Sequence, residues 1–157
     1  MASRNDGERV LALSLQLTRT HRELRRRVDD LINGIKAADG AAPRVDEELR
    51  AHCLAFCGAL TTHHRGEDDG LFAELLRERP DLAGTIANLV QDHTLIEGIL
   101  TRVVELAERT DLDEVGRELD GLAAIMESHF RYEERTLAAA LDAGVPDTGW
   151  SGPMLSP

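Results

Sequence analysis

The chain has 157 residues, and its 29 acidic residues outnumber 18 Lys and Arg to give a formal charge of −11. Such an acidic chain is a poor candidate for binding nucleic acid or an anionic membrane surface, because both require clustered cations. Aromatic residues make up only 3%, which argues against an all-β fold, whereas the abundant Leu, Ala, Glu and Arg favour helices. We expect one all-α domain in the cytosol, with no membrane-spanning helix and no N-terminal targeting peptide.

Apolar residues recur at helical spacing in four segments separated by Gly, Pro and Asp residues. These stripes cover residues 10–35, 49–75, 82–103 and 115–141. The first pattern breaks at Gly40, and Asp111 with Glu114 has the spacing of a capping box before the fourth. Long helices with short connections predict an up-down-up-down four-helix bundle over residues 1–142. Residues 143–157 form a Gly/Pro-rich tail, and the pattern leaves open whether its Trp150 packs on the bundle.

Each stripe is interrupted near its middle by polar residues that keep the helical spacing and therefore point inward. The interrupting residues, in chain order, are His21, then His63, His64 and Glu67, then His93 and Glu97, and finally His129 and Glu133. Inward-facing imidazoles and carboxylates are costly unless they are paired or bind a metal.

The interruptions fall at matched heights along neighbouring helices. Glu67 and His93 each lie 13 residues from Pro80, and His93 and His129 each lie 18 residues from Asp111. At about 1.5 Å per residue, these counts place the polar groups in one layer. His52 lies outside that layer, and we interpret it as structural or exposed.

Helix angles suggest what the layer is for. At about 100° per residue, Glu67 falls between His63 and His64, as a carboxylate bridging two metal ions would. A mixed nitrogen and oxygen set suits iron or manganese better than a thiolate zinc site, and helix bundles can hold dinuclear centres in this way. The alternatives are hydrogen-bonded core histidines and surface His–Glu pairs, which matched heights in four helices disfavour. Cys53 and Cys57, four residues apart, are expected to be small core residues.

Four segments resemble the hemerythrin/HHE cation-binding superfamily: TRTHREL, LTTHHRGEDDGLF, VQDHTLIE and SHFRYEERTL. Together they form the pattern H, HxxxE, H, HxxxE. The resemblance implies a four-helix bundle with two Fe ions in a non-haem centre, bridged by two carboxylates and an oxo or hydroxo group. Carried over residue by residue, it implies terminal ligands at His21, His63, His93 and His129, and bridges at Glu67 and Glu133.

The sequence departs from the oxygen-carrying members of that superfamily at two points. They have HxxxH on the third helix, where this chain has Glu97, and His64 is then a candidate extra ligand for the second ion. They also have an acid five residues after the last histidine, which makes Glu134 the alternative to Glu133. Tyr132, one turn from His129, is a candidate ligand, hydrogen-bond partner or proton donor.

A carboxylate at Glu97 would make the shell harder and more anionic, which favours the ferric state and turnover with O2 or peroxide. The leading hypothesis is therefore a catalase- or peroxidase-like protein with an oxidative-stress role and a separate redox partner. The alternatives are non-catalytic O2 or NO binding, sensing or iron handling, and a structural zinc bundle. Gly66 and Gly98 flank the layer and either open a small-gas pocket or allow close helix packing.

Overall fold

The computed structural model describes residues 11–38 and 43–156, and over these ranges the protein is all-helical. Val10, which begins the first predicted apolar stripe, lies outside the described residues. Gly40, where that pattern was expected to break, also lies outside them. The long helices are α1 (Leu13–Ala37), α2 (Pro43–Gly66), α4 (Ala83–Glu108) and α5 (Leu112–Asp142). Shorter elements are the π-helical turn η2 (Glu67–Leu71), α3 (Phe72–Glu78), the 3-10 turn η3 (Pro80–Leu82) and α6 (Ser151–Leu155).

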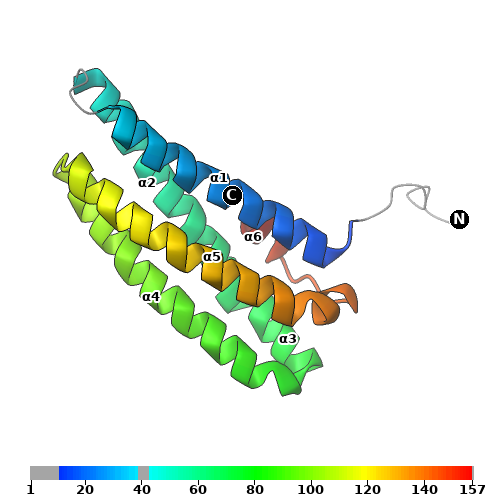
Figure 1. The fold of residues 1–157 in the computed structure, drawn as a ribbon. Coiled ribbons are helices and arrows are strands. Elements are labelled where there is room, and N and C mark those ends of the chain that lie inside the picture. The colour runs from blue at the N-terminus through cyan, green and yellow to red at the C-terminus, as the bar shows by residue number, and fades with distance from the viewer. Residues whose placement is uncertain (1–10, 39–42, 157) are drawn as a thin grey trace, which may run out of the picture.

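The four long helices lie side by side and form a closed ring of contacts (Figure 1). Helix α1 packs against α5 and α2, and α4 packs against α5 and α2, so each long helix has two long neighbours. This arrangement directs the apolar stripe of each helix toward a shared interior. Within the described part of the chain, no helix is long and apolar enough to cross a membrane.

Two helix starts follow from local sequence. Helix α2 begins at Pro43, where a missing N–H costs nothing because the first turn has no acceptor for it. Before α5, the Asp111 side chain accepts a hydrogen bond from the Glu114 N–H at 3.3 Å, which confirms the predicted cap. The Glu114 carboxylate pairs with Arg117, so the box is formed in one direction only.

The second predicted helix is not continuous, and on this point the sequence interpretation was wrong. Helix α2 ends at Gly66, the chain widens into the π-helical turn η2, and α3 then continues to Glu78. Such a turn adds a residue to the helix, and π turns are frequent at functional sites. Glu67 is its first residue, so the wide turn begins within the polar layer itself.

Two apolar clusters fill the bundle, one on each side of the polar layer. The stripe of α1 passes from Leu17 in one cluster, through His21, to Leu24 in the other. The other three long stripes cross between the same two clusters. Cys53 and Cys57 are buried free thiols in the cluster that contains Leu24, which confirms the expectation that they are core residues.

The tail is part of the second cluster. Trp150 is 6% exposed and Met154 is fully buried, and both belong to the cluster that contains Leu17. Helix α6 packs mainly on α2 and also touches α1. The described part of residues 143–157 therefore completes the apolar core beside the polar layer.

Candidate metal centre

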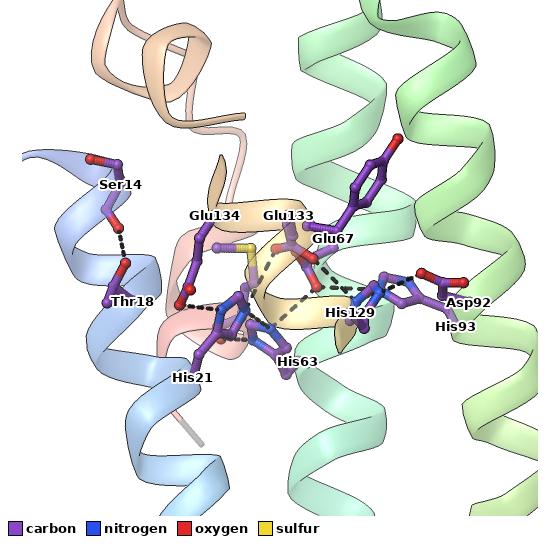
Figure 2. A network of polar contacts seen from close by, with 12 residues as sticks. Ser14, Thr18, His21, His63, Glu67, Asp92, His93, His129, Glu133 and Glu134 are labelled. Carbon is purple, nitrogen blue, oxygen red and sulfur yellow. Dashed lines mark hydrogen bonds and ion pairs between the residues drawn. The ribbon is translucent and has the colours of Figure 1, made fainter. Parts of the chain in front are cut away.

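The inward polar residues converge at mid-height from all four long helices and from η2 (Figure 2). Two groups of four ligand atoms form there, and the atoms within each group lie within 4.8 Å of one another. We call them half-site A (His64, Glu67, His93 and His129) and half-site B (His21, His63, Glu67 and Glu133). All of these residues are buried, so the cluster is enclosed by protein.

The two glutamates lie between the half-sites. Glu67 Oε1 is 3.2 Å from His63 Nε2 and 3.5 Å from His93 Nε2. Glu133 Oε1 is 3.6 Å from His21 Nε2, while its Oε2 is 3.2 Å from His129 Nε2. Each carboxylate therefore contacts one histidine on either side, which is the placement that a bridging ligand requires.

The outer ring nitrogen of each of four histidines has an oxygen partner. Two are held by aspartates that adjoin cluster residues: His93 Nδ1 lies 2.7 Å from Asp68 and His129 Nδ1 lies 3.0 Å from Asp92. For the other two, His21 Nδ1 lies 3.1 Å from the Glu134 carboxylate and His63 Nδ1 lies 2.6 Å from the Met154 carbonyl oxygen. Carboxylate and carbonyl oxygens accept, so each Nδ1 donates a proton and each Nε2 faces the centre.

That arrangement brings the inner ring nitrogens of neighbouring histidines face to face. The Nε2 atoms of His21 and His63 lie 3.2 Å apart, and those of His93 and His129 lie 3.0 Å apart. Burial lowers the pKa of both His21 and His63, which keeps them neutral. Burial also lowers the pKa of His129, but carboxylates led by Glu133 outweigh it and bring that pKa to about 9. A proton or a metal cation between the rings removes the repulsion.

Several atoms at the centre have no hydrogen-bond partner. They are both carboxylate oxygens of Glu67, both of Glu133, and Nε2 of His64. Burial raises the pKa of Glu67 to about 7, and burial together with the Glu67 charge raises the pKa of Glu133. Burying carboxylates without partners costs several kcal/mol. Cations at the two half-sites would use these same atoms, so the residues present fit a metal centre.

Glu97 does not join the cluster, contrary to the prediction from its HxxxE spacing. Its side chain is 65% exposed and lies 3.8 Å from Arg65 in a surface ion pair. The buried stripe of α4 continues from His93 to Ile96 and Leu100, and Glu97 is one residue, or about 100°, beyond Ile96. His64 supplies a nitrogen to half-site A, the group that also holds His93.

Other predicted residues lie outside both half-sites. Glu134 holds the outer nitrogen of His21, whereas Glu133 faces the centre. The Tyr132 hydroxyl accepts a hydrogen bond from Asn88 at 3.3 Å and borders a surface pocket, so its role as a proton donor stays a prediction. His52 is exposed, as expected.

The two glycines that flank the layer differ. A Cβ at Gly66 would lie 2.9 Å from Met154 Cβ, so this glycine allows close packing of the tail. A Cβ at Gly98 would have nothing within 4 Å. Only Gly66 follows the close-packing alternative, and neither glycine borders the small cavity beside His64 and His93.

Three of the four oxygen acceptors that hold the outer ring nitrogens of the histidines were not predicted from the sequence. Asp68 directly follows Glu67, and Asp92 directly precedes His93, so an acid beside a cluster residue was an available signal. The Met154 carbonyl had no signal, because a backbone oxygen carries no residue identity.

The fold and the site define a helical protein with a buried His/Glu cluster suited to cations. Residues 14–141 match the family model of the hemerythrin HHE cation-binding domain. The chain therefore belongs to the hemerythrin family, as its motifs predicted. Neither the curated proteins nor the solved structures include a significant match to it.

Proposed function

We propose that this chain is a non-haem di-iron protein that acts on O2 or peroxide. The observation that carries the proposal is the pair of half-sites, each with four converging ligand atoms, joined by two carboxylates. A set of imidazoles and carboxylates without thiolate suits iron better than structural zinc. The ligands in this proposal are His21, His63, His64, Glu67, His93, His129 and Glu133.

Two bound iron ions would supply redox chemistry: disproportionation of peroxide needs no outside electrons, whereas repeated reduction of O2 would need electrons from the separate redox partner. The protein residues would hold the two ions and orient the ligand side chains. The outer acceptors fix the histidine tautomers, while the apolar clusters on both sides of the layer exclude bulk water. Such a dry, rigid centre favours small ligands over hydrated ions.

A small cavity supports the same ligand class. It lies between α2 and α4, is bordered by His64, His93 and Asp68, and measures about 20 Å³. That volume is close to the space one water molecule needs. Ligands the size of O2, peroxide or NO are the ones that such an opening favours.

Non-catalytic binding of O2 or NO is the second candidate, and one observation favours it. The argument for turnover drew on an anionic ligand at Glu97, which lies on the surface. With His64 facing half-site A instead, the shell is richer in imidazole, and the expected preference for the ferric state is weaker.

We also propose that the long helices follow one another up, down, up and down, with residues 1–142 as the bundle. The short connections support this order, since only three residues, 109–111, separate α4 from α5. The convergence of residues chosen for equal distance from the turns supports it as well.

The experiment is metal analysis followed by two assays on the same iron-loaded protein. We expect about two irons per chain with near-ultraviolet absorption from oxo-to-iron charge transfer. Sustained O2 release from added peroxide supports an enzyme, whereas a spectrum that cycles between air and argon supports a carrier or sensor. His93→Ala should abolish either behaviour, and the exposed His52→Ala is the matched control.

Iron-loaded protein that elutes metal-free would overturn the proposal. Tight zinc with no iron uptake would assign the chain to the structural class. Bound iron with neither peroxide turnover nor a reversible cycle would leave iron handling as the function.

A further inference from the structure

The last described segment crosses the bundle beside half-site B, and we call residues 145–156 the C-terminal strap. Its Met154 carbonyl accepts the hydrogen bond from His63 Nδ1 at 2.6 Å. Its Leu155 carbonyl accepts a hydrogen bond from the Thr20 hydroxyl at 3.2 Å. Thr20 directly precedes His21, so two consecutive carbonyls of the strap contact α1 and α2 next to the two histidines of half-site B.

The strap is seated by side chains that need room on α2 and η2. The Trp150 indole donates to the Pro146 carbonyl at 2.9 Å. A Cβ at Gly70 would lie 2.2 Å from Trp150 Cβ, and one at Gly66 would lie 2.9 Å from Met154 Cβ. Gly66 and Gly70, one helical turn apart, thus provide a surface without side chains on which the strap rests.

His63 is the only one of the four outer-partnered histidines whose partner is a backbone carbonyl. The other three are held by carboxylates on η2, α4 and α5. The partner of His63 comes from outside the four long helices, so its position depends on how the strap sits.

We propose that the C-terminal strap positions the metal centre: Met154, through its carbonyl, fixes the tautomer and direction of His63 and so sets the metal affinity of half-site B. Met154 is a positioning residue, since it acts through His63. The inference rests on the proposed metal centre. With the strap seated, His63 Nδ1 holds its proton and Nε2 faces Glu67. With the strap displaced, the ring loses its acceptor and its fixed orientation.

The test uses full-length, metal-free protein titrated with Co²⁺. Gly70→Ala adds the atom that collides with Trp150, and Gly98→Ala adds the same atom where nothing lies within 4 Å. Loss of an outer partner of a ligating histidine weakens metal binding by about 10–100-fold. We expect that loss for one of the two Co²⁺ ions in Gly70→Ala, with the other ion unchanged, and no loss in Gly98→Ala.

A second readout needs no metal. In the metal-free protein, the His63 Nδ1 proton should give a protected imidazole N–H resonance in ¹H–¹⁵N spectra, assigned by its absence in His63→Gln. The resonance should persist in Gly98→Ala and disappear in Gly70→Ala. Trp150→Ala should repeat the loss, and Trp150→Phe, which keeps a ring on the glycine surface, should restore both the resonance and the second ion.

Equal weakening of both ions in Gly70→Ala would show a merely structural strap and overturn the proposal, as would an unchanged titration. If Gly70→Ala fails to fold, Trp150→Ala makes the same test without adding an atom. Wild-type protein that binds no Co²⁺ and no iron would overturn the proposed function instead. In that case, persistence of the His63 resonance in the variants that displace the strap would independently overturn the positioning role proposed for Met154.

Discussion

The two half-sites share Glu67 but differ in what stands behind their histidines. In half-site A, His93 and His129 are backed by two aspartates. In half-site B, His21 is backed by Glu134, whose carboxylate also lies 3.5 Å from Arg25, and His63 is backed by a neutral carbonyl. Anionic partners make an imidazole a stronger ligand. Half-site A should therefore bind its metal more tightly than half-site B.

The half-sites also differ in their covering. Half-site A borders the small cavity between α2 and α4. Half-site B lies under the strap, and the Phe130 ring stacks on His21 at 3.9 Å with an angle of 7° between the rings. A ligand arriving through that cavity should meet half-site A first. The same helices therefore build two inequivalent metal positions, one near an opening and one enclosed.

The largest expected effect is at the shared carboxylate. Glu67→Gln removes the charge that both half-sites use, so we expect both ions to be lost in metal analysis. In thermal unfolding, the metal-free variant should be more stable than metal-free wild-type protein, because an unpartnered buried carboxylate is gone. Glu97→Gln is the matched control, with the same HxxxE spacing but an exposed side chain. Full iron content in Glu67→Gln would refute the shared position.

Removing a histidine from one half-site should separate the two. His64 has a buried Nε2 without a hydrogen-bond partner and belongs only to half-site A. We expect His64→Ala to keep about one ion per chain, in half-site B, because the four residues of that half-site are unchanged. His52→Ala should keep both. Two tightly bound ions in His64→Ala would show that His64 is not a ligand.

A smaller change is expected from the outer partner of His93. Asp68→Asn replaces its anionic acceptor with a neutral one and should weaken one ion by about 10–100-fold in Co²⁺ titrations. The neighbouring Asp69 is exposed, so Asp69→Asn serves as the control. If the two variants titrate alike, the anionic backing does not distinguish half-site A from half-site B.

The smallest effect is expected at the open side of α4. Gly98→Ala should stabilise the protein by about 0.5–1 kcal/mol, because alanine loses less backbone freedom in a helix and meets no neighbour there. Its Tm should rise by a few degrees. Gly66→Ala, under the strap, should lower it because of the contact with Met154. A drop in both variants would mean that the two sides of the layer are packed alike.

Periodicity in the sequence was enough to locate the helices and the polar layer. Leu17, His21 and Leu24 lie at helical spacing, and helical geometry alone turns them toward one interior. Counting from the turns then placed His93 and His129 at one height, since the rise per residue is constant. These features depend on local geometry, which a sequence encodes directly.

The tertiary structure decided which of the borderline residues face the centre. His64 and Glu97 both stand near the edge of an inward stripe, and packing of α2 against α4 buries the first and leaves the second on the surface. The contact between the strap and His63 could not be predicted from the sequence either. Residues 145–156 have no periodicity, and they contact His63 through a backbone oxygen. Contacts between distant segments depend on shape and close fit, and no local pattern records them.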